Sequence, residues 1–279
     1  MSQHKAPQGF LTFAKNSDQV DYLDLAYIQA LNIKATQSEC NQFAVIVDQE
    51  THAKLKPHHE QAFDFVIVHD SDGPYDAEAM AFWLTPFKET IKLESDLLFT
   101  RSIDHWWHAF RYRDVCLSQG CRDYQQQISH CRKYRELFDA NNLPDVYNGL
   151  MYFRFSQTAR DFFTNAKRIF ENWSQVQSEL KNMQTAMPST DVVFALAARI
   201  TGVELCTLPS MDFINFVHMK PAINNFSEEQ VFTDVFVTEF DSGMIRINNV
   251  NQYHPVHYYD KDFITEEMRE YYERFRRIN

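Results

Sequence analysis

Four short apolar runs, separated by stretches with helical spacing, organise the first hundred residues of this chain. Each run is short enough for a buried strand, and between the runs apolar residues recur at intervals of three and four, which predicts helices. The runs occupy residues 10–14, 43–47, 63–68 and 90–93, and the helical patterns occupy residues 20–33 and 77–84. Alternating strands and helices are typical of an α/β fold with a largely parallel sheet. Such sheets bind ligands beyond the carboxyl ends of their strands, where acidic residues gather in this sequence.

The rest of the chain shows a more helical middle and an extended C-terminal part. An apolar helix pattern covers 191–200, extended patterns lie around 231–237 and 244–247, and a charged helix pattern covers 266–277. No low-complexity linker or internal repeat interrupts the chain. We therefore expect one domain over residues 1–279 with a C-terminal elaboration.

Glycine is scarce, and this scarcity excludes several common enzyme classes. The chain has 6 glycines in 279 residues, and they stand far apart. They cannot form a G-x-G-x-x-G dinucleotide loop, a Walker loop or a G-x-S-x-G nucleophile elbow. The sequence therefore argues against Rossmann dehydrogenases, P-loop NTPases and α/β-hydrolases.

The charge and cysteine content favour a cytoplasmic protein. The formal net charge is −11, which gives no global attraction to nucleic acid or to an anionic membrane. The 5 cysteines are odd in number and unevenly spaced, so a disulfide framework is not expected. No apolar run approaches the roughly 20 residues of a membrane span, and the first residues lack the apolar core of a signal peptide. We expect no membrane partner.

Residues 101–135 form a basic stretch inside this acidic chain, with 7 basic and 3 acidic side chains. Aromatic residues lie between the basic ones, and such a combination could stack on a flipped or single-stranded base and contact phosphates. The alternative is that Trp106, Trp107 and Phe110 pack in the core. Three cysteines and a histidine in this stretch have a spacing outside the usual zinc-finger patterns, so zinc is not expected there. These residues are Cys116, Cys121, His130 and Cys131.

Glu94 and Asp96 stand two residues apart at the end of the fourth strand pattern. At that spacing on an extended strand, both carboxylates point to the same side. Hard oxygen ligands of this kind can hold Mg²⁺ or Mn²⁺, and such a cation can neutralise a bound diphosphate. In the alternative interpretation, Glu94 caps a helix or pairs with Lys88 or Lys92, and Asp96 fixes a turn.

Two segments, in order along the chain, carry a resemblance to a known family. Residues 84–104, LTPFKETIKLESDLLFTRSID, are similar to the D-x-D region of GT-A glycosyltransferases of the glycogenin and bacterial galactosyltransferase type. Residues 12–16, followed by Tyr22 and a helix, resemble the first strand and nucleotide-binding loop of that family. The likeness covers roughly residues 9–110 well and the rest loosely. It extends to glycosyltransferase-like proteins encoded by tailed bacteriophages.

The resemblance implies a GT-A (Rossmann-like) fold, with a mixed, mostly parallel central sheet flanked by helices. Within the single domain it implies a nucleotide-binding half over 9–110, a donor and acceptor half over 111–221, and an elaboration over 222–279. It also implies a nucleotide-sugar donor, expected to be a UDP-sugar, and Mn²⁺ or Mg²⁺ as the cofactor. Asp96 would be a metal ligand, and Glu94 would take the first D-x-D position, where the family has Asp. The residues expected to contact the nucleotide-sugar are Thr12, Phe13, Ala14, Asn16, Tyr22, Lys88, Glu94, Lys220 and Lys261.

Two downstream positions are matched to the family's donor-sugar and catalytic region. Asn148 precedes a strand pattern and resembles the family's Asn beside the donor sugar, although a plain turn would explain it equally. Asp191 opens a helix pattern, where it could hydrogen-bond the hydroxyls of the donor sugar or simply cap the helix. Thr190 stands where the family has Gln.

The family completes its metal site with a late histidine and holds the diphosphate with a lysine. By chain order we assign these roles to His257 and Lys261, although the segment lacks the family's glycine. His218 and Lys220 form a second candidate pair, which we expect to line the same pocket. Imidazole suits Mn²⁺ as a third ligand, and an ammonium group suits a leaving phosphate.

The expected function is therefore sugar transfer from a nucleotide-sugar to an acceptor hydroxyl, with retention of anomeric configuration implied by the resemblance. The phage likeness implies 5-hydroxymethylcytosine in DNA as the acceptor, bound near residues 101–135. The net negative charge argues against DNA, because affinity for DNA depends on phosphate contacts. A glycan or protein acceptor, and a catalytically silent module that only binds a nucleotide, are the alternatives.

Overall fold

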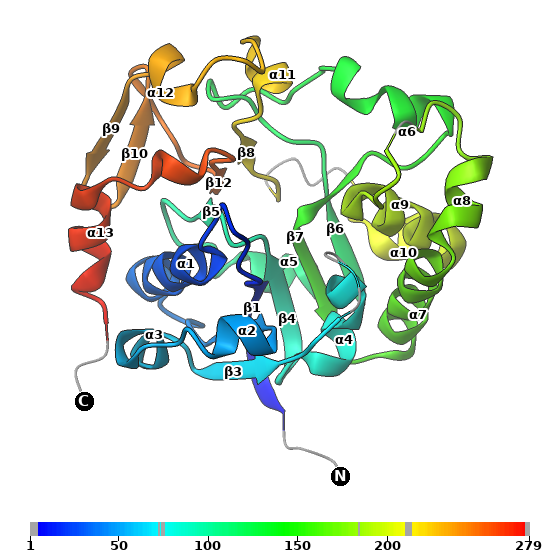
Figure 1. Ribbon diagram of the computed structural model, residues 1–279, viewed down its shortest axis with the longest axis horizontal. Helices are drawn as coiled ribbons and strands as arrows, with labels where there is room; N and C mark the ends of the chain where they lie inside the picture. Colours follow the sequence, from blue (N-terminus) through cyan, green and yellow to red (C-terminus); the bar gives the residue numbers. More distant parts are fainter. Residues whose placement is uncertain (1–4, 72, 74–75, 184, 210–213, 277–279) are drawn as a thin grey trace.

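The structure, a computed structural model, describes residues 5–71, 73, 76–183, 185–209 and 214–276. Its centre is a six-stranded sheet with the strand order β3-β2-β1-β4-β7-β6 (Figure 1). Neighbouring strands from β3 to β4 pair in parallel, β7 runs antiparallel to β4, and β6 runs antiparallel to β7. The strands are β1 (Ala6–Phe13), β2 (Phe43–Val47), β3 (Phe65–Val68), β4 (Phe87–Leu93), β6 (Val115–Gln119) and β7 (Val146–Arg154). The predicted mixed, mostly parallel sheet is confirmed.

Helices cover both faces of this sheet (Figure 1). The longer ones are α1 (Tyr22–Thr36), α7 (Gln157–Glu171), α8 (Trp173–Glu179), α9 (Thr190–Thr201) and α13 (Glu266–Glu273). The shorter α-helices are α2 (Gln49–His52), α3 (Pro57–Ala62), α4 (Ala81–Leu84), α5 (Trp106–Phe110), α6 (Glu136–Ala140), α10 (Val203–Cys206), α11 (Pro221–Asn224) and α12 (Phe232–Val235). The 3₁₀ turns are η1 (Asp76–Met80), η2 (Lys133–Arg135) and η3 (Lys261–Phe263).

The sheet separates two apolar cores, as a largely parallel sheet requires. Alternate residues of β1 show the division, because Phe10 belongs to the core on the α1 side and Leu11 to the core on the α7 and α9 side. Both residues are fully buried. Strands β6 and β7, from the segment 111–221, complete the sheet built by β1–β4. The two predicted halves therefore share one sheet, and the proposed division of the domain stays a prediction.

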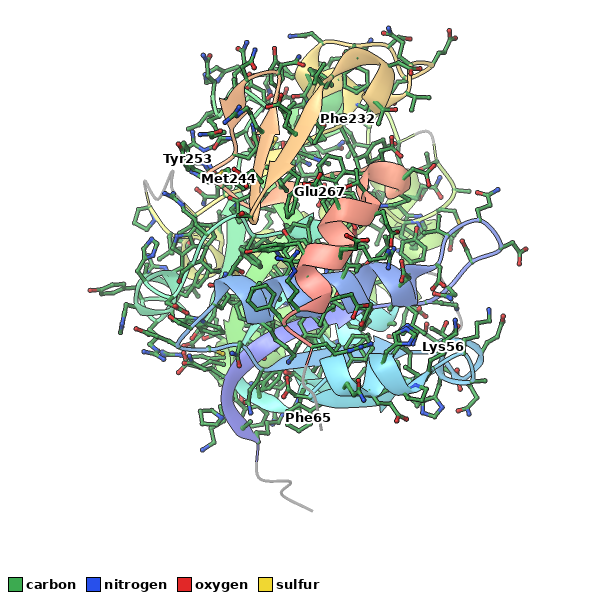
Figure 2. The ribbon with its side chains drawn as sticks, turned by 90° about the vertical axis from the view of Figure 1, so that its left-hand side faces the viewer. Lys56, Phe65, Phe232, Met244, Tyr253 and Glu267 are labelled. Carbon is green, nitrogen blue, oxygen red and sulfur yellow. The ribbon has the colours of Figure 1, made fainter. Side chains whose placement is uncertain are left out.

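Two small sheets lie beside the central one. Strands β9 (Thr238–Asp241), β10 (Met244–Ile247) and β11 (Val250–Asn251) form an antiparallel sheet. Figure 2 shows β10 and α13, marked by Met244 and Glu267, with α12, marked by Phe232, above them in this view. The second small sheet has the order β5-β12-β8 and consists of β5 (Leu97–Leu98), β12 (Val256–His257) and β8 (Val217–His218).

The extended pattern around residues 231–237 predicts a strand, and this prediction is wrong. The structure has the short helix α12 there, at Phe232–Val235. The rings of Phe232 and Phe236 lie 5.0 Å apart, and both side chains are buried. The apolar pattern therefore reflects aromatic packing rather than strand pairing. The predicted helix at 77–84 divides into η1 and α4, and α13 ends at Glu273, before the predicted 277.

Gly9 lies where β1 crosses the ring of Phe87, and we expect the substitution Gly9→Ala to destabilise the fold. A Cβ atom at Gly9 would lie 2.3 Å from the Phe87 ring, which is fully buried and cannot move aside cheaply. Overpacking of this kind costs about 1–3 kcal/mol of unfolding free energy. Urea denaturation measures the loss, and Gln8→Ala on the same strand, which removes an exposed contact to Arg111, is the control. Equal stability of the two variants would contradict the prediction.

Candidate functional site

A pocket of about 450 Å³ lies at the carboxyl ends of the parallel strands. Its lining includes Asn16 after β1, Asp48 after β2, His69 after β3 and Glu94 after β4. This is the edge at which α/β sheets bind ligands. The residues predicted from the sequence that line the pocket are Phe13, Asn16, Tyr22, Glu94, Asp96, Lys220, His257 and Lys261.

Three predicted metal ligands meet in this pocket. The Nε2 atom of His257 lies 3.0 Å from Oε2 of Glu94 and 3.0 Å from Oδ1 of Asp96. The other carboxylate oxygen of Asp96 accepts a hydrogen bond from the ammonium group of Lys261. Each of these four residues lines the pocket. The structure thus places His257, rather than His218, against the two carboxylates. Lys220 lines the pocket as expected, but His218 does not.

The small β5-β12-β8 sheet explains how a late histidine reaches the end of β4. Strand β5 follows the acidic segment directly, and β12 pairs with it so that His257 lies opposite Leu97. The N–H of Tyr258 donates to the carbonyl oxygen of Asp96 at 3.1 Å. On the other side of β12, His218 pairs with His257, and the two rings stack with centroids 4.5 Å apart.

Two buried polar residues of α1 hydrogen-bond the backbone of the acidic segment, residues 94–96, and of the residues that follow it. The amide of Gln29 donates to the carbonyl oxygens of Glu94, at 2.6 Å, and Leu97, at 2.8 Å. The amide of Asn32 exchanges two hydrogen bonds with the backbone of Phe99. Both side chains are fully buried, and their hydrogen bonds hold the segment from Glu94 to Phe99, whose only regular element is the two-residue strand β5. Sequence reasoning missed both residues. They lie among the apolar residues of the predicted helix, and no motif marks them as partners of the acidic segment.

The charged residues of this group shift one another's pKa values. Burial alone would raise the pKa of Asp96, but the charge of His257 and the hydrogen bonds from His257 and Lys261 hold it well below its usual value. Burial raises the pKa of Glu94, with His257 opposing the shift. Burial alone would lower the pKa of His257, yet the charges of Asp96 and Glu94 outweigh it and raise that pKa. Burial and the charge of His257 lower the pKa of His218 well below its usual value.

Glu94, Asp96 and His257 fit a divalent cation. One ligand atom from each residue lies within 4.8 Å of the others, which is close enough for a shared ion. Two carboxylate oxygens with one imidazole nitrogen form a donor set that suits Mn²⁺. Gly149 contributes space, because a Cβ atom there would meet Oε2 of Glu94 at 3.4 Å and the ring of Phe216 at 3.2 Å.

Two lysine–tyrosine pairs flank the acidic group. The ammonium group of Lys261 lies 5.8 Å from the ring centroid of Tyr22, and that of Lys220 lies 5.6 Å from the ring centroid of Tyr259. All four residues line the pocket. Such distances are typical of cation–π contacts, and ammonium groups beside a polar cavity attract phosphate groups. Of these residues, sequence reasoning missed only Tyr259.

Asn148 and Asp191, predicted as catalytic, come together behind the pocket rather than in its lining. The backbone N–H of Asn148 donates to Oδ1 of Asp191 at 2.7 Å, and Oδ2 of Asp191 lies 3.5 Å from the guanidinium of Arg135. The side-chain amide of Asn148 donates to Glu78. Asp191 caps no helix, because α9 begins at Thr190 with Ser189 as its N-cap. Neither residue is in the pocket lining, and the catalytic role of Asn148 and Asp191 stays a prediction.

Three residues predicted to contact the nucleotide-sugar lie outside the pocket lining. The hydroxyl of Thr12 donates to the carbonyl oxygen of Leu93 at 2.9 Å and is buried. Ala14 is fully buried in the apolar core. Lys88 is exposed near the start of β4, whereas the pocket lies at the other end of that strand. A residue on an extended strand advances about 3.3 Å, so the five positions between Lys88 and Leu93 keep them well apart.

Sequence reasoning missed a buried ion pair that lines the pocket. Lys92 pairs with Glu78 of η1, and their side chains are 1% and 13% exposed. Lys92 also donates to the carbonyl oxygen of Asn148 at 3.3 Å. Both Lys92 and Glu78 line the pocket. The signal in the sequence was a lysine inside an apolar strand run, since an unpaired charge is rarely buried.

The basic stretch 101–135 contributes largely to internal contacts. Trp106, Trp107 and Phe110 are buried, which confirms the core interpretation. Among the arginines, five contact partners within the chain: Arg111 with Glu89, Arg113 with the Thr207 carbonyl, Arg122 with Asn215, Arg132 with Asp139 and Asp145, and Arg135 with Asp145 and Asp191. These contacts leave the stretch a poor phosphate-binding surface.

The cysteines of this stretch form no metal site with their neighbours in the part of the chain that the structure describes. Burial raises the pKa of the Cys116 thiol to about 12 and that of Cys121 to about 11, which disfavours the thiolate that zinc requires. Within the same described residues, no helix is both long enough and apolar enough to cross a membrane.

Comparisons with solved structures find distant similarity to glycosyltransferases. No family model matches this sequence, and no curated protein matches it. Mouse xyloside xylosyltransferase 1 is similar at 10% identity over 70% of this chain and 82% of its own, with a TM-score of 0.47. The glycosyltransferase GlyE of Streptococcus pneumoniae TIGR4 is similar at 8% identity over 73% of this chain and 45% of its own, with a TM-score of 0.45. An active-site mutant of LgtC is similar at 14% identity over 67% and 69%, with a TM-score of 0.42.

Proposed function

We propose that this chain is a GT-A-type glycosyltransferase that takes its sugar from a nucleotide-sugar, with UDP as the nucleotide. The proposal rests on one observation above all. Glu94, Asp96 and His257 meet in a pocket at the carboxyl ends of the parallel strands, with Lys220 and Lys261 in the same lining. A cation bound at this site, together with the two ammonium groups, would match the negative charge of a diphosphate. The resemblance of residues 12–22 and 84–104 to the family also points to a nucleotide-sugar site here.

In this proposal the acidic group holds a divalent cation. Asp96, Glu94 and His257 are the ligands, and the bound cation would supply positive charge against the diphosphate leaving group. Lys261 now neutralises Asp96. If a cation neutralised the carboxylates instead, the ammonium group of Lys261 could leave Asp96 and face a phosphate oxygen. Lys220, on the other side, adds a second positive charge as the bond from the anomeric carbon to the phosphate oxygen breaks.

The remaining pocket residues bind and orient the donor. Asn16 in the β1–α1 loop and Tyr22 at the start of α1 receive the nucleotide, in keeping with the resemblance. Glu78 and Lys92 lie on the β4 side of the pocket and present polar groups to the transferred sugar. Asn148 keeps Glu78 in place by a hydrogen bond from its amide. We propose retention of configuration from the resemblance alone, which requires the acceptor hydroxyl to attack the anomeric carbon on the face that the diphosphate leaves. The bond from the acceptor oxygen to the anomeric carbon forms as the bond to the phosphate oxygen breaks, and the hydroxyl proton passes to the departing diphosphate.

For the acceptor, the observations favour a molecule other than DNA. The arginines of residues 101–135 are engaged within the chain, and the formal net charge is −11. A DNA acceptor needs several free cationic side chains for its phosphates. The proposed transfer to 5-hydroxymethylcytosine therefore has no support in this surface.

We expect UDP with Mn²⁺ to raise the melting temperature, because a ligand that binds only the folded state stabilises it. At about one hundred times the dissociation constant, the stabilisation is about 2.7 kcal/mol, or roughly 5 °C or more for a chain of this size. UDP-glucose and UDP-galactose should release UDP in the presence of Mn²⁺, and EDTA should abolish that release. Mn²⁺ alone and UDP with EDTA are the controls.

The two measurements separate the possible outcomes. UDP release that EDTA abolishes supports the proposal. A shift in melting temperature without release from any UDP-sugar, with or without added acceptor, would instead indicate a silent nucleotide-binding module. The absence of both would refute the donor site.

A further inference from the structure

Lys261 pairs with the carboxylate that the proposed cation would need. Its ammonium group forms an ion pair with Oδ2 of Asp96, while Nε2 of His257 lies 3.0 Å from Oδ1. The side chain of Asp96 is 6% exposed. Opposite charges attract more strongly in such a poorly hydrated position than at the surface. Both oxygens of Asp96 therefore face a positively charged or hydrogen-bonding partner that belongs to the chain itself.

The backbone on both sides of Lys261 is held in place. Tyr258 is fully buried, its N–H donates to the carbonyl oxygen of Asp96 at 3.1 Å, and its ring stacks on that of Phe263 with centroids 5.2 Å apart. The side chain of Asp260 caps η3, the turn that contains Lys261. An intramolecular partner held so close competes at a high effective concentration with any ligand from solution. Lys261 is therefore a built-in competitor for Asp96.

The side chain of Lys261, unlike its backbone, has room to move. It is 30% exposed, and its ammonium group lies 5.8 Å from the ring centroid of Tyr22, which also lines the pocket. Lysine carries its charge on a flexible four-carbon stem. Rotation about the bonds of that stem can turn the ammonium group from Asp96 toward a phosphate in the same pocket while the backbone stays in place.

A divalent cation and the ammonium group of Lys261 would compete for Asp96. The three ligand atoms of the proposed cation site, one from each of Glu94, Asp96 and His257, lie within 4.8 Å of one another. A cation among them would stand close to the ammonium group, and like charges repel strongly in a buried site. A diphosphate in the pocket changes this balance, because it offers Lys261 a different anion. The carboxylate of Asp96 is then available to the cation.

We propose that Lys261 is an internal counter-ion of the acidic group, and that its exchange between Asp96 and a diphosphate couples cation binding to diphosphate binding. This inference rests on the proposed function, since it needs both ligands in one pocket. While Lys261 pairs with Asp96, a cation without diphosphate binds weakly. The coupling is reciprocal, so the cation raises the affinity for diphosphate by the same factor. The pocket thereby selects the cation–diphosphate complex over either component alone.

Titration of Mn²⁺ without nucleotide tests this proposal, with the electron paramagnetic resonance signal of free Mn²⁺ as the readout. Lys261→Met should bind Mn²⁺ about tenfold or more tightly than the wild type, because a site that is blocked in about nine molecules of ten loses about tenfold in apparent affinity. Lys261→Arg keeps the charge and should stay within about threefold of the wild type. The factor by which UDP raises Mn²⁺ affinity should be about tenfold larger in the wild type than in Lys261→Met.

Lys88→Met is the matched control, because it removes the same charge from the far end of β4, outside the pocket lining. Its Mn²⁺ affinity should equal that of the wild type within about twofold, since solvent screens so distant a charge. Asp96→Asn in the Lys261→Met background should abolish the gain in Mn²⁺ affinity. If near-ultraviolet circular dichroism shows that Lys261→Met does not fold, Lys261→Gln replaces it, because glutamine keeps a hydrogen-bond donor for Asp96 without the charge.

The outcomes separate this proposal from the proposed function. If Lys261→Met binds Mn²⁺ no more tightly than the wild type, while UDP with Mn²⁺ still binds, the counter-ion is overturned and the donor site stands. Tighter Mn²⁺ binding by Lys261→Met without UDP binding to either protein supports the competition for Asp96 and refutes the nucleotide site. If neither protein binds Mn²⁺, with or without UDP, the cation site is refuted and both proposals fail.

Discussion

Replacing Asp96 by asparagine is expected to lower the rate of UDP release by at least about 10²-fold. Asparagine keeps the size of the side chain but removes the charge that His257 and Lys261 both face. It also replaces one of the two carboxylates offered to a cation. Loss of one preorganised electrostatic contact in an active site commonly lowers the rate by 10²–10³-fold. The rate is measured with UDP-glucose or UDP-galactose and Mn²⁺, per folded molecule as judged by near-ultraviolet circular dichroism.

Glu89→Gln provides the matched control for this substitution. Glu89 lies on β4, just before the acidic segment, and its partners Arg111 and Tyr152 are outside the pocket lining. Its replacement removes a charge without touching the proposed cation site, so the rate should stay within about twofold of the wild type. A rate for Asp96→Asn close to that of Glu89→Gln would remove Asp96 from the mechanism.

Replacing Lys92 by methionine is expected to lower the free energy of unfolding by about 3–5 kcal/mol. Lys92 is 1% exposed, and its ammonium group pairs with Glu78 and donates to the carbonyl oxygen of Asn148. Methionine fills similar space but leaves the Glu78 carboxylate without its cation in a largely buried position. For a chain of this size the loss corresponds to a fall in melting temperature of roughly 5–9 °C. Thermal and urea denaturation measure it.

A second substitution in the same pair separates the lost charge from lost packing. Lys92→Met combined with Glu78→Gln removes both charges, so the double variant should be more stable than Lys92→Met alone. Lys54→Met is the surface control, because Lys54 pairs with the exposed Glu50 at 3.0 Å, and such pairs contribute about 0.5 kcal/mol or less. If Lys92→Met and Lys54→Met lower the free energy of unfolding equally, the buried pair contributes no more to stability than the surface pair.

The strands of the central sheet could be predicted because they are buried on both faces. Phe43–Val47 is an unbroken apolar run with turn residues around it, and the structure gives β2 the same bounds. The same argument failed for 231–237, where apolar residues pack as aromatic pairs around a single helical turn. Apolar content alone does not distinguish these cases, because both bury their side chains.

The candidate site was predictable where it depends on a strand end and less so elsewhere. Glu94 and Asp96 follow β4 directly, so their side chains face the pocket. Lys88 was placed in the pocket by resemblance, but it lies at the opposite end of that strand, and Lys92 takes a place in the lining instead. Glu78 was missed because it belongs to a 3₁₀ turn, whose sequence carries no motif, and its position depends on the partner Lys92.

His257 and Lys261 lie far along the chain from Glu94 and Asp96, and this separation has a consequence for folding during synthesis on the ribosome. Lys261 and its partner Asp96 are 165 residues apart in the chain. Because domains begin to fold as the N-terminal part emerges, β1, β2, β3 and β4 can pair long before β12 exists. A nascent chain would then carry Glu94 and Asp96 side by side with neither the imidazole nor the ammonium group to balance them. The complete group of carboxylates, imidazole and ammonium would therefore form only after residues 257–261 leave the exit tunnel.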